Sequence, residues 1–314
     1  MSFSSEVKDE LIKHVASARH CQLAELAAIF ISMGYIGQSD SGELTLYIQA
    51  ENTPAVRKCF TLLKKAFNIE TNLLPEVSDK HENGRIYKPF LQGDALIAKF
   101  LKAIRLMDES GKVFDPAEGV NPLIVRNACC KRAYLRDSFI CIGSMSDPKK
   151  SYHLEYVCSY EKQADSIKDM LGSFEIEAKV IKRKKYYVVY IKEGSEIVDI
   201  LNVIEAHISL MNLENLRIYK EMRNSVNRRV NCEAANITRT VSAASKQCED
   251  ILYIQKHYGF NNLQDGLRQM AEVRLQHPDA TLQELGGLLD PPVGKSGVNH
   301  RLRKLCELAE KIRS

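Results

Sequence analysis

The chain of 314 residues contains no tryptophan and no apolar run near the ~18 residues that a bilayer-spanning helix needs. Its first residues are polar and charged, which predicts no secretory signal. Nine cysteines are scattered without a CxxC pair, and eight histidines show no HxH or HExxH spacing. The sequence therefore predicts no membrane segment, no metal ion and no cofactor. Its cysteines are expected to be reduced in the cytoplasm.

A phosphate-binding loop is also excluded, because the spacing of its motif is not met. The letters GKS occur at Gly294–Ser296, but Leu289 occupies the place where a P-loop needs its first glycine. A helix-forming segment also precedes the letters, where the motif requires a strand. No nucleotide site is predicted.

What is present fits a protein with a sizeable core. Hydrophobic residues make up 45% and charged residues 27% of the chain, as in ordinary globular proteins. The length suggests two or three domains. A net charge of +4 is mild, so the distribution of the cations carries more information than their sum.

The last fifth of the chain, Thr281–Ser314, has the pattern of a helix-turn-helix. Two amphipathic segments flank a short turn, Asp290–Gly294. Thr281 and Glu284 have capping-box spacing at the start of the first helix, and Ser296 is expected to cap the second. The apolar positions of the second helix predict a buried side made of Val298, Leu302, Leu305 and Leu308 or Ala309.

The second helix of such a motif lies in the major groove of DNA, with its first turns nearest the base edges. Arg can pair with guanine, Asn with adenine, and a helix start can meet phosphate. Which side chains read bases and which hold phosphates is left open, and a plain helical hairpin with a solvated cationic face is the alternative. The predicted DNA-binding residues are Thr281, Lys295, Ser296, Asn299, His300, Arg301, Arg303 and Lys304.

Two other basic stretches are candidate auxiliary DNA contacts. Lys182, Arg183, Lys184 and Lys185 form a run followed by two tyrosines, which suits either nucleic acid or a solvated strand edge that discourages aggregation. Residues 212–245 are rich in cations, including Arg228 and Arg229, and are predicted to be a basic linker or helix. Their cations can line a phosphate backbone or a solvated helix face.

The larger N-terminal part repeats one order of elements, helix, hairpin, helix, hairpin, helix. The two copies are placed at about 15–110 and 124–211, with a strand expected at Thr71–Val77. Gly34 and Gly143 end apolar helices at corresponding points. The pattern predicts a duplicated α+β domain.

This order resembles the LAGLIDADG homing-endonuclease fold, two αββαββα units that pack through paired helices. The motif falls on Leu26–Gly34 and Leu135–Gly143. In active members an acid before the final glycine binds the catalytic metal, but Met33 and Ile142 stand there, and neither offers Mg²⁺ an oxygen. No catalytic residue is therefore expected. Asp137 is predicted to be a solvated or capping carboxylate.

Three segments, Ser2–Leu11, Asn227–Ala244 and Leu288–Leu305, resemble the WhiA family of bacterial regulators, and the resemblance covers essentially the whole chain. It implies a degenerate LAGLIDADG-like domain at 1–211, a linker at 212–245 and an all-α helix-turn-helix domain at 246–314. It also implies DNA-binding proteins tied to sporulation in filamentous actinobacteria and to cell division and chromosome segregation in other Gram-positive bacteria.

The resulting expectation is a non-enzymatic, sequence-specific DNA-binding protein that regulates transcription. Its partner is double-stranded DNA in promoter regions, with RNA polymerase or another regulator as a candidate protein partner and the nucleoid as its location. Two alternatives remain, a divalent-metal nuclease with an unrecognised site and an N-terminal domain that is mainly a protein-interaction scaffold. The DNA site, the sense of regulation and the oligomeric state are left open.

Overall fold

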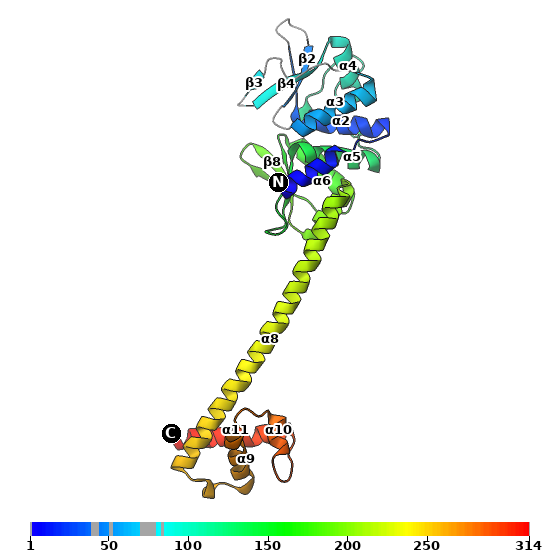
Figure 1. Cartoon of the computed structure of the whole chain (residues 1–314). Coiled ribbons are helices and arrows are strands. Elements are labelled where there is room, and N and C mark those ends of the chain that lie inside the picture. The colour runs from blue at the N-terminus through cyan, green and yellow to red at the C-terminus, as the bar shows by residue number, and fades with distance from the viewer. Residues whose placement is uncertain (1, 39–43, 50–52, 70–79, 83–84, 314) are drawn as a thin grey trace. The chain divides into compact units, whose positions relative to one another are not determined.

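The computed structural model describes residues 2–38, 44–49, 53–69, 80–82 and 85–313 (Figure 1). The chain forms two compact units, Met1–Tyr219 and Lys220–Ser314, and the division falls within the long helix α8 (His207–His257). The strand expected at Thr71–Val77 lies outside the described residues. Among the described residues, every helix falls short of the length or the apolarity needed to cross a bilayer.

The first unit contains the same order of elements twice. The first copy consists of α2 (Arg19–Met33), β1 (Gly34–Gln38), β2 (Leu44–Gln49), α3 (Thr53–Phe67), β3 (Lys80–Glu82), β4 (Arg85–Gln92) and α4 (Asp94–Ala103). The second consists of α5 (Ala128–Ile142), β5 (Gly143–Met145), β6 (Leu154–Cys158), α6 (Glu161–Gly172), β7 (Lys179–Arg183), β8 (Tyr186–Ile191) and α7 (Gly194–Val203). A short 3₁₀ turn, η1 (Pro116–Glu118), lies between them. The predicted αββαββα duplication is confirmed.

Each copy builds one antiparallel sheet with the same strand arrangement. The orders are β1-β2-β4-β3 and β5-β6-β8-β7. Gly34 pairs with Ile48 in the first sheet and Gly143 with Tyr156 in the second, so both sheets begin directly at the end of the preceding helix. The two copies therefore share their strand pairing as well as their order of elements along the chain.

The core of the first unit is organised around the packed pair α2 and α5, whose side chains are mostly buried. Both helices end at a glycine for the same steric reason. A Cβ on Gly34 would lie 2.2 Å from the Phe30 ring, and one on Gly143 would lie 2.3 Å from the Phe139 ring. The chain can turn into its first strand only where no side chain competes with the phenylalanine ring.

Helix α1 (Phe3–Ile12) joins the start of α8 to this core. The Glu10 carboxylate accepts hydrogen bonds from the backbone N–H groups of Ile208 at 2.8 Å and Ser209 at 2.9 Å. These are N–H groups that have no partner within the helix, and an anion at that end is also favoured by the helix dipole.

The regular elements of the second unit are all helices among its described residues. It contains the C-terminal part of α8, η2 (Phe260–Asn262), α9 (Asp265–Gln276), α10 (Leu282–Gly287) and α11 (Lys295–Arg313). Arg313 Nη1 donates to Asp250 Oδ1 at 2.7 Å, and Arg274 Nε donates to Gln247 Oε1 at 3.1 Å, which fix α11 and α9 to α8. Residues 212–245, predicted as a basic linker or helix, lie wholly within α8.

Candidate nucleic-acid interface

Helices α10 and α11 form the predicted helix-turn-helix. The capping box at the start of α10 is confirmed, because Glu284 N donates to Thr281 Oγ1 at 3.3 Å and Thr281 N donates to Glu284 Oε2 at 2.8 Å. These hydrogen bonds favour the ionised carboxylate and lower the pKa of Glu284. The first helix of the motif therefore has a fixed starting point.

The turn is held by a close backbone approach at Gly286. Val293 N donates to Gly286 O at 3.0 Å, and a Cβ on Gly286 would lie 2.1 Å from Val293 O. Gln269 Nε2 on α9 donates to Asp290 O at 3.1 Å, which ties the turn to α9. Only glycine fits where α10 meets the turn.

The start of α11 differs from the prediction. Ser296 was predicted to cap this helix, but the helix begins at Lys295, and Val298 N donates to Gly294 O at 3.1 Å. Gly294 thus occupies the capping position, and Ser296 lies inside the first turn. Lys295 and Ser296 are both exposed at the end of a helix that has no acid in its first turn. Such an end favours an anion.

The two sides of α11 have opposite chemistry. Val298, Leu302, Leu305 and Ala309 are almost completely buried, which confirms the predicted inward side, while Leu308 is half-buried. At about 100° per residue, Ser296, His300 and Arg303 follow one another along the opposite side. The exposed residues of the first turns are Lys295, Ser296, Asn299, His300, Arg303 and Lys304.

Arg301 does not point outward as predicted. It is half-buried, and its Nη1 donates to the backbone oxygen of Gly266 on α9 at 3.3 Å. The reason is its place on the helix, three residues after Val298 and four before Leu305, which puts it beside the buried side. Arg301 therefore links α11 to α9.

Arg303 is exposed and forms an ion pair with Glu307, with Nε 3.0 Å from Oε1. Both side chains are largely exposed, so the pair is worth at most about 1 kcal/mol and is easily exchanged for another anion. The Arg303 guanidinium is thus available to a stronger acceptor.

The remaining predicted cations lie elsewhere. Lys182 to Lys185 form the exposed tip of the β7–β8 hairpin, where the Lys182 ammonium lies 5.3 Å from the Tyr187 ring and the Lys185 ammonium 5.4 Å from the Tyr186 ring. Arg183 Nη2 lies 3.3 Å from Glu155 Oε1. Arg228 and Arg229 are exposed on α8.

In the first unit, the helix ends that resemble the LAGLIDADG motif carry no acid. Met33 is the last residue of α2 and is buried, and Ile142 is the last residue of α5 and is half-buried. Neither side chain contains an oxygen that a hard divalent cation could use.

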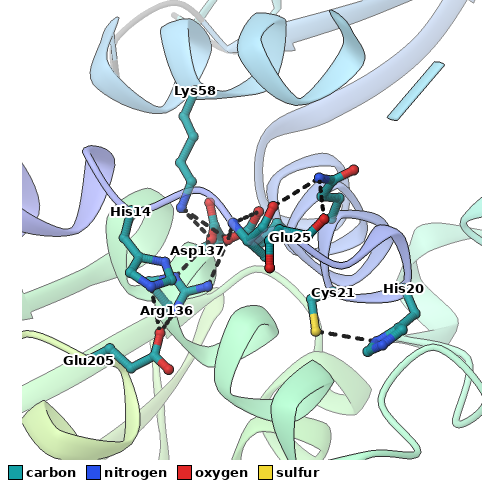
Figure 2. A network of polar contacts seen from close by, with 11 residues as sticks. His14, His20, Cys21, Glu25, Lys58, Arg136, Asp137 and Glu205 are labelled. Atoms are coloured by element: carbon teal, nitrogen blue, oxygen red, sulfur yellow. Dashed lines mark hydrogen bonds and ion pairs between the residues drawn. The ribbon is translucent and has the colours of Figure 1, made fainter. Parts of the chain in front are cut away.

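Asp137 is neither solvated nor capping, so that prediction was wrong. It is fully buried, and its Oδ2 accepts from Lys58 Nζ at 2.7 Å (Figure 2). Its side of α5 faces the interior of the helix pair, where Lys58 arrives from α3. Burial raises the pKa of Asp137 to about 7, although the Lys58 charge opposes the rise.

The same buried network spans the helix pair. Glu25 of α2 lies 3.5 Å from Lys58 Nζ and accepts from Arg136 Nη2 at 2.7 Å. Arg136 also pairs with Glu205, which contacts His14 at 3.0 Å (Figure 2). The hint in the sequence is that charged residues, Glu25 in α2 and Arg136 and Asp137 in α5, lie among the apolar residues of the two helices. Their partners lie on distant segments, so sequence spacing could not find them.

Two copies of the αββαββα unit packed through paired helices, together with a capped helix-turn-helix, define a LAGLIDADG-like domain joined to a helix-turn-helix domain. Family models agree over most of the chain: the WhiA N-terminal LAGLIDADG-like domain matches residues 19–107, the WhiA LAGLIDADG-like domain 131–223 and the WhiA C-terminal HTH domain 226–309. The chain belongs to the WhiA family.

Relatives support this assignment over the full length. "Probable cell division protein WhiA" of Lachnoclostridium phytofermentans is 49% identical over 319 residues and covers 100% of each chain. The protein of the same description from Alkaliphilus metalliredigens is 42% identical over 313 residues, covering 100% of this chain and 99% of its own. The crystal structure of full-length DUF199/WhiA from Thermatoga maritima, 24% identical, covers 99% of each chain with a TM-score of 0.59 and has the same fold. The family and its helix-turn-helix point to DNA binding rather than DNA cleavage.

Proposed function

We propose that this chain is a sequence-specific DNA-binding regulator that reads promoter DNA through the outward side of α11 and cleaves no DNA. The observation that supports it most is the chemistry of that side. Hydrogen-bonding and cationic side chains occupy the exposed first turns, opposite a buried apolar side, on the second helix of a capped helix-turn-helix. That helix is the one such motifs place in the major groove.

The proposal assigns a role to each exposed residue of the first turns. Arg303 is the best guanine reader, because it is exposed and its only described ion pair is a weak one. Asn299 suits adenine, and Ser296 and His300 suit several base-edge groups. Lys295, at the helix start, is assigned to phosphate.

The other predicted contacts have supporting roles in this proposal. Lys304 flanks the reading side and is assigned to phosphate, and Thr281 is proposed to contact the DNA backbone beside the start of α10. Arg301 is reassigned, because its contact with Gly266 makes it a residue that positions α11 against α9. The auxiliary cations Lys182, Arg183, Lys184, Lys185, Arg228 and Arg229 are exposed and would add phosphate contacts.

The absence of cleavage is proposed on the chemistry of the paired helices. Met33 and Ile142 leave the helix ends without an oxygen ligand, and Asp137 is buried against Lys58. A nuclease that assembles Mg²⁺ there would need at least one hard oxygen donor in reach of solvent. The first unit is then free to act as a scaffold, and RNA polymerase or another regulator is the proposed class of partner.

The biological setting is proposed from the relatives. Their names place them in cell division, and we extend that setting to this chain, with transcription, sporulation and chromosome segregation as the regulated processes and the nucleoid as the location.

The test is duplex binding by the full chain, measured on labelled fragments of genomic promoter DNA. Binding is expected to weaken steeply with salt, because each phosphate contact contributes a slope of about −0.9 in log affinity against log salt. Combined replacement His300→Ala and Arg303→Ala is expected to weaken binding to the preferred fragments at least about tenfold.

The matched control is Lys311→Ala, which removes a cation from the last turn of the same helix. It is expected to change the affinity less than about threefold, as for a single remote phosphate contact. Equal losses in the two variants would contradict the reading role of the first turns. Supercoiled plasmid is expected to stay intact with the same protein and Mg²⁺, and strand breaks would favour the nuclease alternative.

A further inference from the structure

Four potential metal ligands meet where α2 and α5 begin. The ligand atoms of His20, Cys21, Cys129 and Cys130 all lie within 4.8 Å of one another. His20 Nδ1 is 3.2 Å from Cys130 Sγ and 3.3 Å from Cys21 Sγ, and Figure 2 shows His20 and Cys21 together at this end of α2. A tetrahedral zinc ion, with Zn–S of ~2.3 Å and Zn–N of ~2.0 Å, holds its ligand atoms about 3.5–3.8 Å apart. The cluster is therefore close to the size of such a site.

The internal repeat explains how the four residues meet. His20 and Cys129 stand at the same distance along the chain before Gly34 and Gly143, and so do Cys21 and Cys130. Each helix of the central pair thus contributes two adjacent residues from its first turn. The cluster lies at the opposite ends of α2 and α5 from Met33 and Ile142, which the homing-endonuclease resemblance had singled out.

We propose that His20, Cys21, Cys129 and Cys130 form a Cys₃His site for zinc that clamps the starts of the two paired helices. Three sulfurs and one imidazole nitrogen are the donors that zinc prefers in closed structural sites, and thiolates select against Mg²⁺ and Ca²⁺. This site is separate from DNA recognition by α11.

The surroundings fit an anionic metal centre. Three thiolates around a divalent ion leave a net charge of −1, and two helix N-termini favour a negative charge. Neither helix has a side-chain cap on its first turn, at Ala18 or at Asn127.

The burial of the four residues also fits a zinc site that an ion can reach from solvent. Cys21 and Cys130 belong to the hydrophobic core of the first unit, whereas His20 and Cys129 are exposed. An ion can enter from the exposed side and finish inside the helix pair. The bond energy would then hold together two helices that lie far apart in the chain.

The test uses the full chain without a histidine tag, reduced and stripped of metal by a chelator. Titration with Co²⁺ is expected to give an intense thiolate-to-cobalt absorption in the near ultraviolet and the visible bands of a tetrahedral ion, saturating at one equivalent. Zn²⁺ should displace the cobalt, and zinc at a hundredfold excess over its Kd should raise the Tm of the first unit by about 5 °C or more.

Two variants keep the test independent of folding. His20→Ala and Cys129→Ser change exposed residues, so circular dichroism should stay native while the absorption bands are lost or strongly reduced. Cys232→Ser, which removes an exposed thiol of α8, should titrate like the parent. Absence of the bands in the reduced parent would overturn the proposal, and so would bands that survive both variants. It would also be overturned if cysteines of the cluster are joined in a disulfide and the protein takes up no metal after reduction.

Discussion

At the residue scale, the first unit contains a network of buried charges in its central helix pair. Asp137 is an acid in the motif helix, yet it is fully buried, and its Oδ2 accepts from Lys58 inside the protein. Removing one member of a buried pair leaves the other charge without compensation, which usually costs more than the pair contributed. The network is therefore a structural element of the helix pair.

The raised pKa of Asp137 gives a pH-dependent stability with a definite sign. Its folded pKa of about 7 lies above the unfolded value of about 3.9, so the folded state holds the proton more tightly. The contribution to unfolding free energy is largest when Asp137 is protonated, and it falls as pH rises from about 4 to about 7. Relative to Asp137→Asn, the parent should lose on the order of 1–3 kcal/mol of stability between pH 5 and 8.

Calorimetric melting of the first unit's transition at several pH values measures this difference. Asp199→Asn, which removes an exposed carboxylate of α7, is the matched control and should follow the pH dependence of the parent. A parent and an Asp137→Asn variant with parallel pH profiles would show that Asp137 does not titrate in this range.

At the element scale, the helix-turn-helix depends on one glycine contact. Gly286→Ala would push a methyl group to 2.1 Å from Val293 O, a clash with backbone that cannot move without opening the turn. Overpacking of this kind costs about 1–3 kcal/mol. The second unit should melt at a lower temperature, and DNA affinity should fall because α11 loses its fixed position.

The neighbouring Gly287→Ala is the control. A Cβ there meets no atom within 4 Å, and alanine is a better helix former than glycine by about 1 kcal/mol. The thermal transition of the second unit should therefore stay the same or rise, with DNA affinity kept. If the two variants melt at the same temperature, the close approach at Gly286 is not what fixes the turn.

At the scale of the whole molecule, local patterns predicted the order of elements well. The helix-ending glycines, the capping box at Thr281 and the 3-4 spacing of Val298 and Leu302 each reflect a rule that acts within a few residues. These rules sufficed for the duplicated αββαββα domain and for the helix-turn-helix. The LAGLIDADG and WhiA resemblances then supplied the pairing of the two copies.

What the sequence could not predict depends on contacts between distant segments. Asp137 is buried because Lys58 arrives from another helix, and Arg301 turns inward because Gly266 offers its carbonyl. The Cys/His cluster lacks any metal-binding spacing, since its two halves are adjacent pairs from different helices. The assignment of α11 residues to bases and phosphates stays a prediction.

The central claim, that the first turns of α11 read bases, is tested most directly by selecting bound fragments from a pool of random duplexes. The parent chain is expected to enrich one motif. Arg303→Ala should enrich a motif that has lost its preference at one guanine position, while Lys311→Ala should enrich the parent's motif unchanged. If Arg303→Ala, His300→Ala and Asn299→Ala all enrich the parent's motif with undiminished preference at every position, sequence reading by this side of α11 is contradicted.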